Sequence, residues 1–517
     1  MRAEIIEKLR GVVGKAAVVA DETELLVYEC DALAIFKSKP DAVVFPQTTE
    51  QVSAIVKIAC EYGLPFLPRG AGTGLSGGAM AAEGGIIIEM QKMNRILSID
   101  QENRIAVVQP GVVNLHITQA TAPLGLYYAP DPSSQMACTI GGNTAENAGG
   151  PHCLKYGMTT NHILAIEAVL ANGEIVRLGN PAGECVAMDL LGSIVGSEGT
   201  FVIVTEITIR LLPKPQAVKT LLAAYHSVEA CSQTVSDIIA AGIVPAALEF
   251  VDDKTIHAVE ASVFKAGYPL DARAALLIEL DGFQDGIEEM SDAISAICLK
   301  NQAYEVRVAR NDQERAQLWL GRKGAFGAMG RISPDMIVMD AVIPRTRLPD
   351  VLAEVDRLSE LHGLGVANVF HAGDGNLHPL ILFDSRFPDQ VEKIHKLSAE
   401  IMKVCVDAGG ALSGEHGIGI EKKEFMGQLR FAAAHEACIF EIDYALACKA
   451  LQRFHERTGF ALTEEQLRDI DSNHVCFLNA LQRRCIIDTG AYVVTCNICN
   501  GRFSSEEVRV EKWEYNR

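Results

Sequence analysis

The chain has 517 residues, of which 49% are hydrophobic and 22% are charged, so it is long enough for two or three well-cored globular domains. A net charge of −20 argues against nucleic acid as a main partner, because binding it requires a basic face. No stretch approaches the roughly 18 uninterrupted apolar residues of a membrane span, and the first residues do not resemble a signal peptide. We therefore expect a cytoplasmic protein whose fourteen cysteines are reduced thiols.

The first clear element in the chain is a helix in residues 46–63, PQTTEQVSAIVKIACEYG. Thr48 and Gln51 have the spacing of a capping box. Apolar residues then recur at helical spacing, at Val52, Ile55, Val56 and Ala59.

The next stretch, PRGAGTGLSGGAM at 68–80, contains Gly72-x-Gly74-x-x-Gly77, which is the spacing of a Rossmann dinucleotide turn. The context excludes that fold. Pro65 and Pro68 precede the glycines, where a central parallel strand would need their missing N–H groups. Only eight residues separate the motif from the strand-like IIIEM, too few for a crossover helix. A loop of main-chain amides curled around a diphosphate fits better, and a flexible surface loop is the alternative.

Two further stretches rich in small residues follow, PDPSSQMACTIGGNTAENAGG at 130–150 and GSEGTFVIVTEITI at 196–209. Between them, AIEAVLANGEIVRLG predicts a hairpin with a type I′ turn at Asn172-Gly173. Together these segments predict an α+β domain in which three loops of small residues meet one large anionic ligand.

A helix is predicted in QLWLGRKGAFGAM, residues 317–329, with Trp319 and Arg322 on one face at spacing i, i+3. Arginine binds carboxylates through two parallel N–H donors, so Arg322 could hold an acidic substrate. The alternative is a basic pair on the surface.

Histidines flank a tight turn in NVFHAGDGNLHPLILF, residues 368–383, and a helical stretch then leads to ALSGEHGIGIEKKEF at 411–425. A strand–helix–strand-end path could bring Glu415 beside His371. Together with His378 these side chains would form a three-ligand site for Zn²⁺, Mn²⁺ or Fe²⁺, with open positions for substrate. His416 could act as a general base. The alternative is a hairpin at Asp374-Gly375 with two histidines that only pack.

PRGAGTGLSGG, PDPSS, GGNTAENAGGPHCLKYG and GSEGTFVIVTEI resemble the FAD-binding domain of the vanillyl-alcohol-oxidase/PCMH flavoproteins. Within that family, residues 1–428 resemble the glycolate oxidase flavin subunits and D-2-hydroxyacid dehydrogenases. The resemblance implies an α+β protein with an FAD-binding domain at 1–215 and a substrate domain with an antiparallel sheet at 216–428. It also implies that FAD contacts Pro68, Arg69, Gly70, Ala71, Gly72, Thr73, Gly74, Ser76, Pro130, Asp131, Ser133, Ser134, Gly141, Gly142, Asn143, Asn147, Gly150, Glu198, Gly199 and Ile203.

The same resemblance implies FAD-dependent oxidation of a small 2-hydroxy acid, with hydride transfer to flavin N5. His371, His378 and Glu415 would bind a divalent metal, His416 would be the base, and Arg322 would hold the substrate carboxylate. FAD is expected to bind without a covalent link to His152. A second flavin-type subunit and an iron–sulfur subunit would accept electrons and could bring the chain to a membrane.

Three alternatives stay open: a D-2-hydroxyglutarate dehydrogenase, a non-haem metal oxygenase and a non-catalytic flavin subunit. Relatives that take a dicarboxylate have a lysine where SPDMIVMDAVIPR offers Asp335 and Asp340, which favours glycolate or D-lactate. Residues 429–517 depart from the resemblance. We expect a helical, cysteine-rich tail there, in which Cys496-x-x-Cys499 is weak evidence for zinc.

Overall fold

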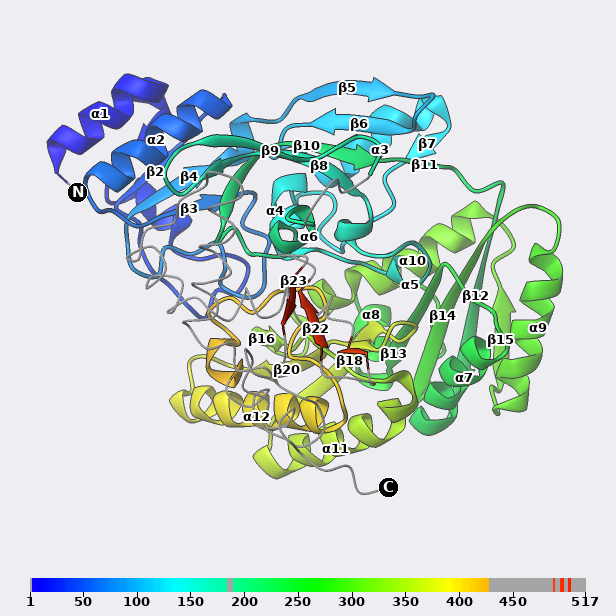
Figure 1. Ribbon diagram of the computed structural model, residues 1–517. Coiled ribbons are helices and arrows are strands. Elements are labelled where there is room, and N and C mark those ends of the chain that lie inside the picture. The colour runs from blue at the N-terminus through cyan, green and yellow to red at the C-terminus, as the bar shows by residue number, and fades with distance from the viewer. Residues whose placement is uncertain (1, 184–188, 427–486, 489–492, 497–500, 504–517) are drawn as a thin grey trace.

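The computed structural model describes residues 2–183, 189–426, 487–488, 493–496 and 501–503. An N-terminal half with two larger sheets lies against a C-terminal half built on one large sheet (Figure 1). Short 3₁₀ turns lie at Lys15–Ala17, Glu24–Tyr28, Met90–Lys92, Ala122–Leu124, Thr159–Asn161, Arg345–Arg347 and Lys423–Phe425.

The first sheet has the strand order β1 (Val18–Val19), β2 (Ala42–Val44), β4 (Ile86–Glu89) and β3 (Phe66–Arg69). Its apolar residues share a core with those of α1 (Ala3–Val13) and α2 (Thr49–Glu61). Thr48 caps α2 by accepting a hydrogen bond from the amide of Gln51, but the Gln51 side chain returns to the amide of Gln47, so the capping box is only half formed.

Strands β3 and β4 are parallel, and no helix lies in the described residues 70–85 between them. β3 is an edge strand, which explains how it accommodates Pro68. The glycine-rich segment is therefore a loop between two parallel strands and does not begin a Rossmann helix.

The second sheet is antiparallel, in the order β5 (Ile96–Asp100), β6 (Ile105–Val108), β10 (Val202–Arg210), β8 (Ile163–Leu170) and β9 (Ile175–Gly179). Short elements surround it: α3 (Asn114–Thr121), α4 (Ile140–Glu146), α5 (Cys153–Tyr156), α6 (Leu191–Ile194) and the pair β7 (Leu126–Tyr127) and β11 (Leu212–Pro213).

The β8–β9 hairpin forms as predicted, but its turn is not type I′. Leu170 and Glu174 close the loop, which therefore has three residues between them. Gly173 has φ +82°, but the φ of Asn172 is not positive. A three-residue loop needs only one left-handed residue, and Gly173 provides it.

The C-terminal half contains a nine-stranded sheet with β15 (Glu305–Val308), β12 (Ala217–Tyr225), β14 (Ala274–Gly282), β13 (Ala247–Asp252), β18 (Gly365–His371), β19 (Asn376–Leu377) and β17 (Ala341–Val342) in that order. β20 (Pro379–Phe383) pairs with both β18 and β16 (Asp335–Val338). The pairs in this sheet are antiparallel, as the resemblance predicted.

Helices cover both faces of this sheet. α7 (Val228–Ala240), α9 (Ile287–Lys300), α11 (Leu348–His362) and α12 (Pro388–Asp407) share one core with it. α8 (Asp253–Glu260) and α10 (Asp312–Met329) share the other. Because side chains alternate along a strand, Glu249 lies on the face of Ala247 and Val251, which is the face of α10. His371 is directly opposite Glu249 in the register of β18 and β13.

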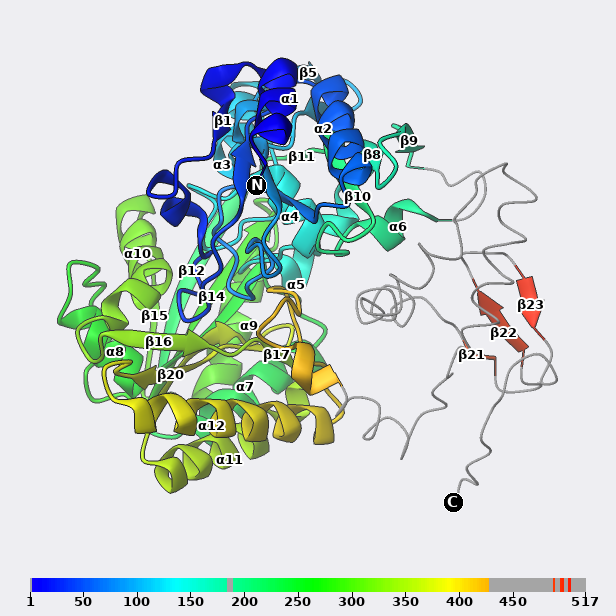
Figure 2. The same cartoon turned by 90° about the vertical axis from the view of Figure 1, so that its left-hand side faces the viewer.

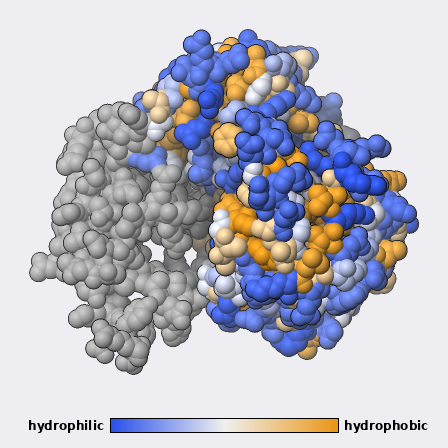
Figure 3. Space-filling model, turned by 90° about the vertical axis from the view of Figure 1, so that its right-hand side faces the viewer, coloured by the Kyte–Doolittle hydropathy of each residue, from blue (hydrophilic) through white to orange (hydrophobic). Residues whose placement is uncertain are grey.

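The visible surface on the side of α9 and β15 is mostly hydrophilic, with separate apolar patches (Figure 3). Among the described residues, no helix is both long and apolar enough to cross a membrane. The described parts of the tail form a small antiparallel sheet of β21 (Ile487–Asp488), β22 (Val493–Cys496) and β23 (Gly501–Phe503), and the expectation of helices concerns the remainder of the tail. The rest of 427–517, including Cys499, lies outside the described residues.

Candidate active site

The three segments rich in small residues meet at one pocket in the N-terminal half. Six of the predicted FAD contacts line it: Pro68, Arg69, Gly70, Gly141, Gly142 and Gly199. Sequence reasoning missed the rest of the lining, which is mainly apolar: Met90, Pro110, Thr139, Ala145, Ile194, Ser197, Val202 and Val204.

The glycines of this pocket allow the segments to pack closely against one another and against Pro110. A Cβ on Gly70 would collide with the Thr139 hydroxyl, one on Gly141 would lie 2.5 Å from Pro110 Cβ, and one on Gly199 would lie 2.9 Å from Pro68 Cγ. Ser76, in the first segment, keeps a buried hydroxyl without a partner. A close-packed, glycine-lined cradle of this kind fits a long phosphate-containing cofactor such as FAD.

Several predicted FAD contacts are polar side chains that stabilise the loops themselves. The guanidinium of Arg69 donates to the carbonyls of Cys30 and Ala79. Asn143 bonds Asn114, and Asn147 accepts from the amide of Thr160.

The remaining predicted FAD contacts in these segments do not line the pocket. The side chain of Ile203 packs in the core of the first sheet, on the opposite side of β10 from Val202 and Val204, so it is no part of the pocket. Gly150 fits closely against the main chain of Asp131, and the Asp131 carboxylate bonds His152. The others lie in the same loops but outside the lining: Ala71, Gly72, Thr73, Gly74, Pro130, Ser133 and Ser134.

His152 has both ring nitrogens engaged. Nδ1 lies 2.9 Å from Asp131 and Nε2 lies 3.2 Å from Glu279 of β14. Burial lowers the pKa of His152, but the two carboxylates outweigh it and raise that pKa to about 10. Both ring nitrogens are thus paired with carboxylates of the protein.

The three predicted metal ligands lie together. His371 ends β18 and His378 lies between β19 and β20, so the tight turn between them brings their rings to 5.1 Å. Glu415 Oε1 is 3.2 Å from His371 Nε2 and 3.4 Å from His378 Nε2. Potential ligand atoms of all three side chains lie within 4.8 Å of one another. Two imidazoles and a carboxylate at this spacing fit a divalent transition-metal ion.

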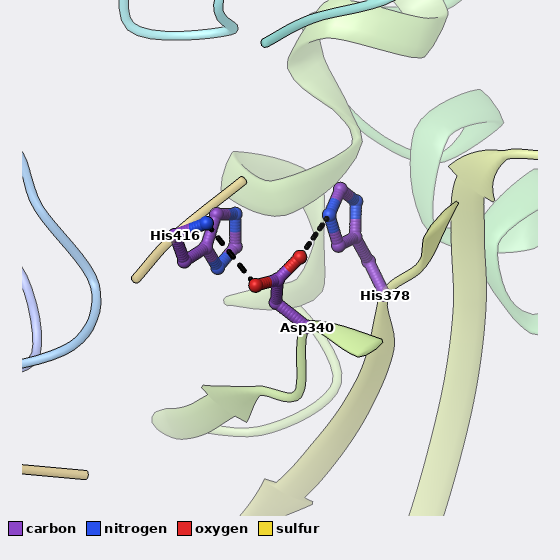
Figure 4. A group of neighbouring side chains, drawn as sticks. All are labelled: Asp340, His378 and His416. Atoms are coloured by element: carbon purple, nitrogen blue, oxygen red, sulfur yellow. Dashed lines mark hydrogen bonds and ion pairs between the residues drawn. The ribbon is translucent and has the colours of Figure 1, made fainter. Parts of the chain in front are cut away.

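Glu415 reaches this position without the strand that the sequence suggested. Its loop is anchored by Asp340, whose buried carboxylate accepts hydrogen bonds from the amides of Gly414, Glu415 and His416. Figure 4 shows Asp340 between His416 and His378.

Asp340, His378 and His416 form a second group with metal-ligand spacing. However, the buried ammonium of Lys422 lies 2.9 Å from Asp340 Oδ2. A cation already neutralises Asp340, so the His371, His378 and Glu415 group is the better ion site. Asp340 is thus a structural anchor, and Asp335 accepts a hydrogen bond from the amide of Ser385.

His416 stacks on His378 with ring centroids 4.9 Å apart and an interplanar angle of 11°. Burial lowers the pKa of His416 to about 4, because the apolar surroundings disfavour the charged ring. Its Nδ1 is buried without a hydrogen-bond partner. The ring is therefore neutral at physiological pH and has a nitrogen available to accept a proton.

Arg322 extends from α10 towards the same site and is 1% exposed. Its guanidinium lies 2.6 Å from Glu249 Oε2, while its Nε has no partner. Glu249 also lies 2.9 Å from His371 Nδ1. Burial raises the pKa of Glu249, but His371 and Arg322 outweigh it and hold the carboxyl ionised.

The candidate ion site and the glycine-rich segments adjoin each other. A Cβ on Gly149 would lie 2.5 Å from Glu415 Oε2. The carbonyl of Ser76 accepts from the amides of Ile420 and Glu421. α5 also lies where the two halves meet (Figure 2).

Sequence reasoning missed Glu249 and Asp340 as parts of this site. A glutamate inside the apolar strand ALEFVD is the kind of signal that could have revealed Glu249, because an ionised side chain is rarely buried without partners. Asp340 was missed because its partners, the loop amides from Gly414 to His416 and the ammonium of Lys422, lie 74 to 82 positions further along the chain.

Two family descriptions match the chain. Residues 40–179 match "FAD binding domain" and residues 214–437 match "FAD linked oxidases, C-terminal domain". The glycolate oxidase subunit GlcD of Escherichia coli K12 is 49% identical over 81% of this chain and 84% of its own length. The Bacillus subtilis GlcD is 43% identical over 78% and 85%. A D-lactate dehydrogenase of Anaerostipes hadrus is 33% identical over 82% and 91%.

Solved structures show the same fold. p-Cresol methylhydroxylase with substrate bound has a TM-score of 0.68 at 18% identity, covering 83% of this chain and 91% of that one. The 4-ethylphenol oxidase of Gulosibacter chungangensis, in complex with isoeugenol, has a TM-score of 0.68 at 19% identity, covering 88% and 93%. The PCMH-type fold expected from the sequence is thus confirmed.

Proposed function

This chain belongs to the family of FAD-linked oxidoreductases that includes glycolate oxidase subunits and D-lactate dehydrogenases, and it is an FAD-dependent 2-hydroxyacid dehydrogenase; we propose that its substrate is glycolate or D-lactate and that a divalent metal assists binding. The observation that carries the metal-assisted mechanism is the cluster of His371, His378 and Glu415 beside Gly149 of the FAD-binding half.

The ion would be held by these three side chains. A set of three protein ligands would leave coordination positions for a bidentate 2-hydroxy acid. When bound, FAD supplies the acceptor for the hydride that leaves the substrate carbon, and the divalent ion supplies a Lewis acid for the hydroxyl oxygen. The roles of the remaining groups follow from their own positions.

His416 is proposed as the general base. Its neutral ring and its unpartnered Nδ1 suit removal of the substrate hydroxyl proton. Stacking on His378, which is a proposed ion ligand, fixes the plane of the His416 ring. Asp340 holds the main chain of His416 and so fixes where the base lies.

Arg322 is proposed to bind the substrate carboxylate. Glu249 engages one end of the guanidinium, and the buried Nε without a partner is the donor that a carboxylate would satisfy. Burial strengthens this interaction because little water competes for it.

The electrons are proposed to leave through partner subunits, a second flavin-type subunit and an iron–sulfur subunit. The Escherichia coli and Bacillus subtilis relatives are themselves described as subunits of a glycolate oxidase, which supports this proposal. A non-haem oxygenase or a non-catalytic subunit is not favoured, because both matched families are FAD-linked and a neutral base lies beside the proposed ligands.

The test is a substrate panel of glycolate, D-lactate, L-lactate and D-2-hydroxyglutarate with a dye as electron acceptor, before and after chelation. We expect glycolate or D-lactate to be oxidised fastest and chelation to abolish turnover while FAD stays bound. Arg322→Ala should retain FAD and lose activity. Fastest turnover of D-2-hydroxyglutarate would contradict the substrate, and undiminished turnover after chelation would contradict the metal.

A further inference from the structure

Glu249 is a fully buried carboxylate that contacts two proposed site residues from different elements. Its Oε1 lies 2.9 Å from His371 Nδ1 on the neighbouring strand, and its Oε2 lies 2.6 Å from the guanidinium of Arg322 on α10. The exposed fraction of Glu249 is 0%. Burying a carboxylate is costly unless it is paired, and these two contacts provide the pairing.

We propose that Glu249 is a positioning residue that orients His371 for the ion and Arg322 for the substrate carboxylate through one shared side chain. This inference rests on the proposed function of His371 and Arg322. It adds Glu249 as the residue that links the position of one to the position of the other.

The first role concerns the choice of nitrogen on His371. A hydrogen bond to Glu249 keeps the proton on Nδ1, so Nε2, which faces Glu415 and His378, is the nitrogen that gives up its proton to an ion. The Arg322 guanidinium lies 3.5 Å from the same Nδ1 but can only donate, so it does not compete for the Nδ1 proton.

The second role concerns the direction of Arg322. Glu249 holds the Nη2 end of the guanidinium, which leaves the unpartnered Nε as a donor for another group. The register of β13 and β18 sets Glu249 directly across from His371, so the carboxylate keeps Arg322 beside the ion site.

The experiment compares Glu249→Gln with Asp252→Asn in the FAD-loaded protein. Asp252 is the matched control because it is a buried carboxylate on the same strand, but it bonds the amides of Thr255 and Asn368 away from the site. Glu249→Asp is the second variant, since it keeps the charge beside Arg322 and withdraws the carboxylate by one methylene. Flavin absorbance and thermal unfolding check that each variant is folded.

Isothermal titration calorimetry with Mn²⁺ gives the first readout. We expect Glu249→Gln and Glu249→Asp to bind Mn²⁺ roughly 10–100-fold more weakly than the wild type, the usual effect of losing a carboxylate behind a histidine ligand. At saturating Mn²⁺ the KM for the preferred 2-hydroxy acid should rise roughly 10-fold, as for one weakened charge-assisted contact. Asp252→Asn should change neither quantity.

Histidine ¹⁵N spectra of the metal-free protein test the contact without an ion. The Nδ1 signal of His371 should shift in Glu249→Gln and stay in place in Asp252→Asn. An unchanged signal would overturn the inference whatever the ion affinity. Mn²⁺ affinity and KM equal to those of the wild type would also overturn it. Failure of the wild type itself to bind Mn²⁺ would instead overturn the proposed metal site, and the spectra would still decide the role of Glu249.

Discussion

The carboxylate of Glu198, in the third glycine-rich segment, accepts a hydrogen bond of 2.8 Å from the main-chain amide of Gly419, three residues after the proposed base. It accepts a second, of 2.7 Å, from the amide of Ile418. Glu198 itself has φ +55°, a left-handed conformation that is uncommon outside glycine. The FAD-binding half therefore holds the loop that carries Glu415 and His416.

Glu198→Gln should lower kcat and weaken FAD retention together. Glutamine offers one acceptor oxygen, so one amide loses a charge-assisted bond worth about 1.5–3 kcal/mol, or roughly 10–100-fold. The measurements are turnover and flavin absorbance after gel filtration. Glu206→Gln, on the half-buried side of β10 near Arg177, is the control and should change neither. A normal kcat in Glu198→Gln would show that the loop does not depend on this contact.

An ion and a proton should compete for His371. Burial lowers the pKa of His371, but Glu249 and Glu415 outweigh it and raise that pKa well above the usual value, so the ion-free ring carries a proton on Nε2. Binding of Mn²⁺ should therefore release about one proton, and Mn²⁺ affinity should fall about tenfold for each pH unit towards acid. Calorimetry in buffers of different ionisation enthalpy measures the release. Affinity independent of pH would contradict this prediction.

His416→Asn should reduce kcat by roughly 10²–10⁴-fold without loss of FAD, because asparagine keeps a polar group there but cannot accept the proton as a base. In the wild type, kcat should hold from neutral pH down towards about 4 and then fall as His416 becomes charged. His395→Asn on α12, an exposed histidine, is the control. A fall in kcat centred near the ordinary histidine pKa would show that burial does not lower the pKa of His416.

Local patterns were enough to predict the parts of this site that lie close in the chain. The helix containing Trp319 and Arg322 follows from the helical spacing of its sequence, and the tight turn that joins His371 to His378 follows from the glycines between them, although the hairpin itself was considered only as the alternative in which the histidines pack. Glu415 could be placed beside them only as a possibility, because its anchor, Asp340, is 75 positions away. Glu249 is 122 positions from His371, and no local signal indicates which strands become neighbours.

His152 should stabilise the fold in a pH-dependent manner and should not carry flavin covalently. Its pKa rises from 6.5 to about 10 on folding, so the stabilisation is fully present below about pH 6.5 and is lost as the pH rises through about 10. His152→Gln should lower the free energy of unfolding at neutral pH, and this difference from the wild type should shrink towards pH 10. Urea titrations measure it. Acid-precipitated wild-type protein should leave its FAD in solution, and a yellow pellet would contradict the non-covalent prediction.

Gly149→Ala should disturb the ion site from the FAD-binding side. The added Cβ would lie 2.5 Å from Glu415 Oε2 and 3.0 Å from Cys153 Sγ, so the carboxylate must move away from His371 and His378. Because three ligands must converge on one ion, we expect Mn²⁺ affinity and kcat to fall by roughly 10–100-fold. Gly11→Ala in α1 is the matched control, since nothing lies within 4 Å of its Cβ and alanine favours the helix by about 1 kcal/mol. Unchanged Mn²⁺ affinity in folded Gly149→Ala would mean that Glu415 does not need this position to bind the ion.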